Sequence, residues 1–159
     1  MQGKTVAESV SLMHHLPMPD ETNQAGSIHG GHLLKLIDNV GGVAACRHAR
    51  TNVVTASLER MDFLTPIYPG ELIILKASVN YAGKHSMEVG VRVEVEHMTS
   101  GQVRHAASCY LTYVAVDEQR NPCRVPPLLL STDLERRRYA RAEERRACHK
   151  EQAAAKAQP

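Results

Sequence analysis

The stretch HLLKLIDNVGGVAACRHAR, residues 32–50, decides the fold. Its apolar residues recur at the spacing of one helix face, and three more widen that surface nearly all round. The first set comprises Leu33, Leu36, Ile37, Val40 and Ala44, and the second comprises Leu34, Val43 and Ala45. A helix that is apolar on nearly every side is buried, so the helix expected from Gly30 to about Arg50 must be wrapped by other elements.

The segments around this helix have the pattern of strands joined by turns. Predicted strands cover residues 52–63, 71–83, 86–98 and 102–116, with a weaker one around 9–16. From Met87 to Val95, apolar and polar residues alternate, which indicates a sheet with one buried and one solvent-facing side. One buried helix among hairpin-linked strands predicts an α+β domain, with the helix packed on a curved antiparallel sheet.

The composition changes after Pro126 and Pro127. Thr132 and Glu135 have the spacing of a capping box, which predicts that a second helix begins here. This helix is polar on every side and is expected to be held by pairs such as Asp133 with Arg137. It therefore lies outside the core.

The charges are unevenly distributed along the chain. Residues 131–159 carry eight Lys and Arg against five Asp and Glu, whereas residues 1–130 carry eleven against twelve. A nearly neutral body argues against nucleic acid as the main partner. The first residues lack the pattern of a signal peptide, and no run approaches the ~20 apolar residues of a membrane helix. We therefore expect a cytoplasmic protein without a membrane partner, and we expect its four separated cysteines to be reduced.

Asp38 is the most informative residue for function, because an unpaired carboxylate on a buried helix is costly. Gly41 and Gly42 lie on its helical face, and each costs the helix ~1 kcal/mol relative to alanine. One interpretation is that the carboxylate overlooks a slot for a substrate or a catalytic water. The other is close helix–sheet packing, with Asp38 paired to an arginine such as Arg47.

The turn-rich loop PDETNQAGSIHGG, residues 19–31, leads into this helix. Gly30 and Gly31 leave backbone N–H groups uncovered at the positive end of the helix dipole, where they could stabilise an oxyanion. Asn23 could orient a water molecule nearby. Alternatively, the loop is an ordinary capped turn in which His29 serves as the cap.

Other kinds of site are disfavoured. His29 and His32 with Asp38 could suggest a metal centre, but the spacing supplies no third well-placed ligand, so we expect no metal. The sequence contains no Gly-x-Ser-x-Gly elbow and no phosphate-binding glycine-rich loop. No cofactor is expected.

The motifs MPDETNQAGSIHGGHLLKLIDNVGGVAACRHA, VVTASLERMDFLTPIYPGE, GKHSMEV and YLTYVAVDE occur in an order that resembles the cytosolic acyl-CoA hydrolases of the hotdog superfamily. The chain is similar to the short bacterial single-domain type and to the halves of the vertebrate brain acyl-CoA hydrolase. The resemblance covers residues 8–130, which we interpret as the thioesterase domain, and leaves a basic helix and tail over residues 131–159.

This resemblance implies a hotdog fold, in which a five- or six-stranded antiparallel sheet wraps a long helix. It implies dimers that assemble as trimers, and hydrolysis of fatty acyl-CoA to free fatty acid and CoA. The family's catalytic positions fall on Asn23 and Asp38, contributed by different protomers. By the same resemblance, Gly30 and Gly31 receive the thioester oxygen.

The phosphates of CoA require cations near the mouth of the slot. Arg60 and Lys84 are candidates for this role, and Ser86 could donate to a phosphate or merely end the hairpin. The alternative to an enzyme is a non-catalytic hotdog module that binds acyl-CoA as a sensor.

Overall fold

A five-stranded antiparallel sheet forms the body of the protein. The structure, a computed structural model, describes residues 1–156. In spatial order the strands are β2 (Ser11–His15), β4 (Glu71–Ala82), β5 (Ser86–His97), β6 (Gln102–Val116) and β3 (Asn52–Phe63). The four long strands were predicted from the sequence to within one residue, and the α+β class is confirmed.

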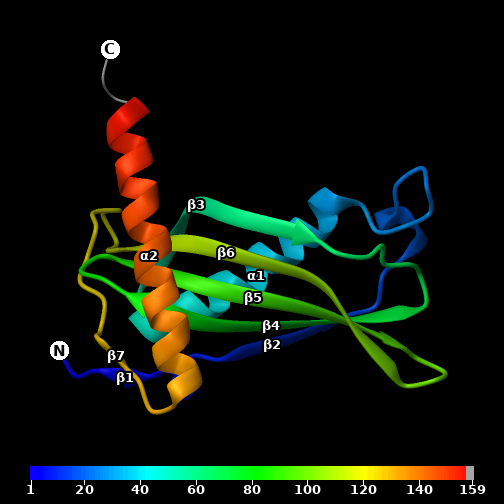
Figure 1. Cartoon of the computed structure of the whole chain (residues 1–159), viewed down its shortest axis with the longest axis horizontal. Helices are drawn as coiled ribbons and strands as arrows, with labels where there is room; N and C mark the ends of the chain where they lie inside the picture. Colours follow the sequence, from blue (N-terminus) through cyan, green and yellow to red (C-terminus); the bar gives the residue numbers. More distant parts are fainter. Residues whose placement is uncertain (157–159) are drawn as a thin grey trace.

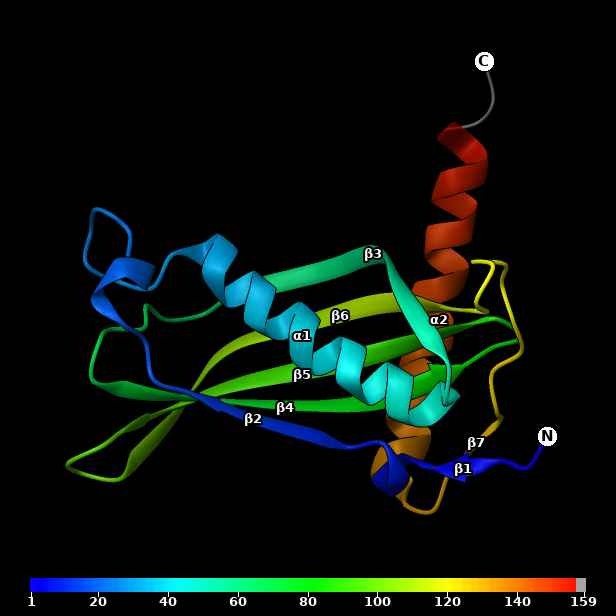
Figure 2. The same ribbon diagram turned by 180° about the vertical axis from the view of Figure 1, so that it is seen from behind.

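The helix α1 (Gly30–Ala49) lies along one face of this sheet (Figure 2). The apolar side chains of one face are buried, and Ile37 and Ala44 are fully inaccessible to solvent, whereas Leu34 is half-buried and Val43 is exposed. On β5, the alternating residues from Met87 to Val95 are buried as well. The predicted packing of this helix on an antiparallel sheet is therefore confirmed, but burial on nearly every side is not, because Val43 remains exposed.

The second helix, α2 (Asp133–Lys156), crosses the opposite face of the sheet (Figure 1). Its predicted capping box is present, since Glu135 N–H donates to Thr132 Oγ1 and Thr132 N–H donates to a Glu135 carboxylate oxygen. Asp133 pairs with Arg136 at 3.4 Å, so the predicted pair with Arg137 is wrong. Residues three apart on a helix are neighbours just as residues four apart are, so Asp133 can reach Arg136 as well as Arg137.

Polar side chains dock α2 on the sheet. Arg145 donates to both carboxylate oxygens of Glu88 at 3.0 and 2.6 Å, and Ala142 is fully buried. Tyr139 contacts Tyr81, with ring centroids 5.0 Å apart. The outer face of the sheet is thus partly covered, whereas the alternation in β5 had predicted that it would face solvent.

The remaining elements are short. β1 (Lys4–Thr5) pairs in parallel with β7 (Leu128–Leu129), and two 3₁₀ turns span Val6–Glu8 and Pro19–Glu21. Neither helix of the described chain has the length and apolar character needed to cross a membrane. Residues 157–159 of the predicted tail lie outside the described residues.

Candidate active site

Asp38 projects from α1 toward the edge of the sheet formed by β3 and β6. Its Oδ1 accepts a hydrogen bond from Thr55 Oγ1 at 2.8 Å, and Tyr113 Oη lies 3.0 Å from both this oxygen and the Asp38 carbonyl oxygen. Burial and the charge of Asp38 raise the pKa of Tyr113, so the phenol is protonated and can donate. Two hydroxyl donors therefore position the carboxylate.

The glycines on Asp38's face make room for a side chain of this same protein. A Cβ added to Gly41 would lie 2.6 Å from Tyr113 Oη, whereas one added to Gly42 would lie 3.8 Å from the nearest atom of that ring. Close helix–sheet packing therefore accounts for Gly41. The predicted pairing of Asp38 with Arg47 is wrong, since Arg47 donates to the Val10 carbonyl oxygen.

Asn23 organises the loop that precedes α1. Its Oδ1 accepts from Ala25 N–H at 2.9 Å, and its Nδ2 donates to Ser27 Oγ at 3.1 Å. The Asn23 N–H donates to the Ser27 carbonyl oxygen at 2.8 Å. These bonds close a tight loop around an exposed amide side chain.

At the start of α1, His29 is the N-cap residue, as one of the two interpretations of the sequence had it. Its Nδ1 accepts a hydrogen bond from Gly31 N–H at 3.0 Å. The Gly31 N–H is thus already engaged. Of the two glycines proposed to receive the thioester oxygen, Gly30 is therefore the better donor.

A pocket of about 370 Å³ opens beside this loop. Asn23 and Gly30 line it, together with Phe63 and residues 64–67. Asp38 does not line this pocket. It lies eight residues after Gly30 on α1, which is ~12 Å along the helix axis at the helical rise. Within one chain, the structure therefore separates the two predicted catalytic residues.

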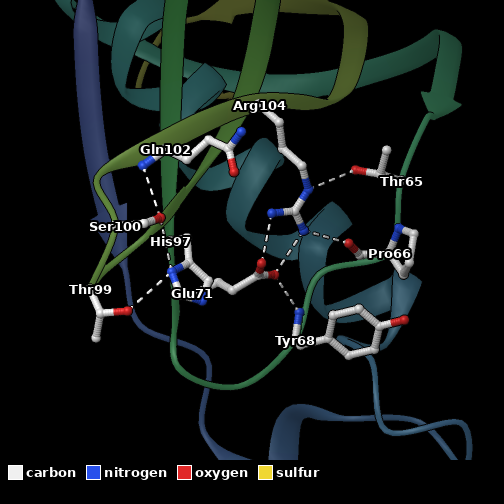
Figure 3. Close-up of polar contacts among 9 residues, drawn as sticks. All are labelled: Thr65, Pro66, Tyr68, Glu71, His97, Thr99, Ser100, Gln102 and Arg104. Carbon is white, nitrogen blue, oxygen red and sulfur yellow. Dashed lines mark hydrogen bonds and ion pairs between the residues drawn. The ribbon is translucent and has the colours of Figure 1, made fainter.

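An ion pair anchors the wall of this pocket (Figure 3). The guanidinium of Arg104 donates to both Glu71 oxygens at 2.6 and 2.8 Å and to the Pro66 carbonyl oxygen at 2.9 Å. Glu71 also accepts from Tyr68 N–H at 2.9 Å. The hydrogen bonds from Arg104 hold the pKa of Glu71 below its ordinary value. The segment 65–68 is thereby tied to the sheet.

Of the residues predicted to bind CoA phosphates, Arg60 lies on β3, whereas Lys84 and Ser86 lie two residues apart at the turn between β4 and β5. Arg60, on β3, pairs with Asp62 at 2.8 Å, and Lys84 is exposed in the turn between β4 and β5. Ser86 Oγ accepts from Arg146 of α2 at 2.8 Å, on the sheet face opposite α1.

His32 has partners other than those considered from the sequence. Its Nε2 lies 3.0 Å from Glu21 Oε1, while His15 Nε2 lies 2.7 Å from Glu21 Oε2. These three are the one group of possible metal ligands among the described residues. Glu21 also accepts from Met18 N–H at 2.9 Å, so the cluster joins β2, the loop and α1.

Burial raises the pKa of Cys109 to about 12, which leaves this thiol protonated.

Sequence reasoning missed Thr55 and Tyr113. The paired glycines signalled that a bulky side chain faces Asp38. Identifying that side chain requires knowing that β6 and β3 lie adjacent, which local patterns do not reveal.

Comparison with known proteins supplies the family. The sequence profile of the Thioesterase superfamily matches residues 25–102. The rat cytosolic acyl coenzyme A thioester hydrolase is 36% identical over 137 residues, which cover 85% of this chain and 36% of that protein. This chain thus spans about a third of the rat protein's length. An uncharacterized acyl-CoA thioester hydrolase of Bacillus subtilis is 38% identical over 117 residues, covering 74% of this chain and 68% of its relative.

Solved structures agree closely with this fold. The acyl-CoA hydrolase of Staphylococcus aureus, determined with butyryl-CoA, CoA and CoA disulfide, matches with a TM-score of 0.90 at 34% identity, covering 98% of this chain and 94% of that one. An apo-hexameric acyl-CoA thioesterase matches with a TM-score of 0.93 at 36% identity, covering 97% and 99%.

Variants of the Staphylococcus aureus enzyme have also been solved with alanine in place of an asparagine, an aspartate and a threonine. Those three positions are separated by 15 and 17 residues. Asn23, Asp38 and Thr55 have the same residue types at the same separations. The chain belongs to the thioesterase superfamily, among the hotdog acyl-CoA hydrolases.

Proposed function

We propose that this protein hydrolyses fatty acyl-CoA thioesters to free fatty acids and CoA, with Asp38 as the general base. The observation that carries the proposal is the carboxylate held by Thr55 and Tyr113. Both donors engage Oδ1 and the described residues supply none to Oδ2, so Oδ2 is the oxygen that can accept a proton from water. The relatives named cytosolic support a cytoplasmic location.

The proposed reaction needs no cofactor, because a thioester carbonyl is already electrophilic. Asp38 removes a proton from water as the water oxygen attacks the carbonyl carbon. The Gly30 N–H stabilises the resulting oxyanion, and Asn23 orients the attacking water. Collapse breaks the carbon–sulfur bond, and the proton held by Asp38 passes to the departing thiolate of CoA.

We further propose that each site is completed by a second copy of the chain. Within one chain, Asp38 does not line the pocket that contains Asn23 and Gly30. Asp38 instead lies beside β3, whose outer edge pairs with no strand among residues 1–156. Exposed Val54, Leu58 and Phe63 lie along this strand. An apolar open edge favours association, and a hexameric structural relative supports a trimer of dimers.

The test is release of free thiol from acyl-CoAs of graded chain length by the purified protein. Wild-type protein should turn over at least one of them, and Asp38→Asn should lower kcat by ~10²–10⁴-fold while remaining folded. Binding without turnover of any chain length would instead identify an acyl-CoA sensor. Wild-type turnover by a folded Asp38→Asn protein would defeat the assignment of the base.

A further inference from the structure

Two histidines and a glutamate meet where the loop between β2 and α1 approaches the sheet (Figure 2). His15 is the last residue of β2, Glu21 ends the 3₁₀ turn, and His32 lies in the first turn of α1. Their ligand atoms all lie within 4.8 Å of one another. From the sequence no metal was expected, because His32 was considered only with His29 and Asp38. The fold gives His32 two different partners.

The distances within this cluster are close to those between adjacent ligands of one ion. His15 Nε2 lies 2.7 Å from Glu21 Oε2, and His32 Nε2 lies 3.0 Å from Glu21 Oε1. The two imidazole rings also approach each other, with centroids 5.6 Å apart. Zn²⁺ binds nitrogen and oxygen ligands at ~2.0–2.2 Å, which places neighbouring ligand atoms roughly 2.8–3.6 Å apart. Small side-chain shifts would therefore suffice to admit an ion.

His32 Nε2 is a buried polar atom without a hydrogen bond. It is almost inaccessible to solvent, and its approach to Glu21 lacks hydrogen-bond geometry, so no described residue bonds to it. Leaving such an atom without a partner is costly. In the tautomer protonated at Nδ1, this nitrogen has a lone pair directed at the cluster, which is what a metal ion requires.

Glu21 is held in the charged form that a cation needs. Burial disfavours the carboxylate, but hydrogen bonds from His15 and from Met18 N–H outweigh burial and lower the pKa of Glu21. The bond from Met18 N–H also orients the carboxylate, as outer contacts do for metal ligands. The Glu21 side chain is 15% exposed and the two histidines are 25% exposed, so the cluster is shielded but open to an entering ion.

We propose that His15, Glu21 and His32 bind one divalent transition-metal ion of the Zn²⁺ class. Two imidazoles and a carboxylate suit Zn²⁺, whereas Mg²⁺ and Ca²⁺ prefer oxygen ligands alone. None of the three lines the pocket that contains Asn23, so the ion takes no part in the chemistry there. The Glu21 carbonyl oxygen accepts from His29 N–H at 2.9 Å and closes the base of the loop that carries Asn23. The ion thus ties this loop to β2 and α1.

Calorimetric titration of the chelator-treated, full-length protein with ZnCl₂ tests the proposal without requiring turnover. Wild type should bind a single Zn²⁺ ion per chain. Loss of an outer contact alone weakens metal binding by ~10–100-fold, so His32→Gln, which removes a ligand, should weaken it by about 100-fold or more. His14→Gln is the control, because it removes the imidazole of an exposed neighbour on β2, and it should bind within about twofold of wild type.

Glu21→Gln keeps the shape of the side chain and provides a second test if His32→Gln does not fold. It should lose Zn²⁺ binding to a similar extent. Wild-type affinity in either folded variant would overturn the proposal. So would the absence of saturable Zn²⁺ binding by wild type, which would leave the cluster as a hydrogen-bonded group alone.

Other histidines and the cysteines could also hold zinc, so a second measurement locates the ion. Addition of Zn²⁺ should slow amide hydrogen exchange over residues 15–32 in wild type and in His14→Gln, but not in His32→Gln. Protection confined to other segments would place the ion elsewhere and overturn the proposal. An inactive protein that still binds Zn²⁺ at this site would refute the proposed hydrolysis and support the metal site.

Discussion

The hydroxyl of Tyr113 lies 3.0 Å from Oδ1 of Asp38, although 75 residues separate the two in the chain. The contact is possible because Gly41, one helical turn from Asp38, has no side chain to fill the space that the phenol occupies. A strand residue and a helix glycine therefore together determine how the proposed base is held.

Tyr113→Phe removes this donor without changing the shape of the ring. Hydrogen bonds to charged groups contribute about 1.5–3 kcal/mol, so a loss of roughly 10- to 100-fold in kcat is expected if the donor positions the reacting carboxylate. Steady-state thiol release measures the effect. Tyr110→Phe is the matched control, because that hydroxyl lies outside the Asp38 network, and it should retain wild-type kcat. Equal rates for all three proteins would refute a positioning role.

Gly41→Ala and Gly42→Ala form a second matched pair. At Gly41 the new methyl group would meet the buried Tyr113 hydroxyl, so unfolding free energy should fall by about 1–3 kcal/mol. At Gly42 there is room, and the substitution should be neutral or stabilising by up to ~1 kcal/mol. Denaturant titration distinguishes the two. The packing argument fails if Gly41→Ala is as stable as Gly42→Ala.

Glu71 should make stability depend on pH. Its pKa is lowered in the folded protein by hydrogen bonds from Arg104, so its contribution is fully present above the ordinary value of 4.5 and is lost as pH falls through the folded value. Glu71→Gln should therefore be less stable than wild type at pH 7, by about 1.5–3 kcal/mol. The difference should shrink below pH 4.5.

Glu96→Gln is the control for Glu71→Gln, because Glu96 lies nearby on the neighbouring strand β5 and makes no ion pair with another described residue. Its stability should follow that of wild type at every pH. A Glu71→Gln deficit that persists unchanged into acid would contradict the assigned role of the ion pair.

The exposed apolar side chains of β3 predict that a charge there prevents association. Leu58→Glu should reduce particle mass in light scattering at micromolar concentration, since an unpaired charge is costly in an apolar interface. Leu129→Glu introduces the same charge at a similarly exposed position on β7 and should leave the mass unchanged. If the wild type is itself monomeric, the proposed dimer is wrong.

The periodic spacing of apolar residues was sufficient to predict most helices and strands of the fold. The buried face of α1 and the alternation in β5 depend on local spacing, so their ends were predicted to within a residue or two. Local spacing could not reveal that α2, polar on every side, packs on the sheet through Arg145 and Glu88. That contact joins residues 57 positions apart, and each charge is satisfied by the other.

The candidate site was predictable in part for the same reason. Asp38 was identified from its improbable position on an apolar helix, and His29 was recognised as a possible cap. Thr55 and Tyr113 could not be assigned, because their roles follow from the pairing of β3 with β6. The cations expected at the CoA phosphates were chosen by residue type alone, and Ser86 lies on the opposite face of the sheet from α1.

The central claim is that Asn23 of one protomer and Asp38 of its partner form one active site. Mixing and co-refolding equal amounts of inactive Asn23→Ala and Asp38→Ala proteins tests it directly. Random assortment gives about half heterodimers, each with one intact site of two, so roughly a quarter of wild-type activity should return. If both residues act within one protomer, every site retains a defect. Activity that stays at the level of the separate variants would contradict the shared site.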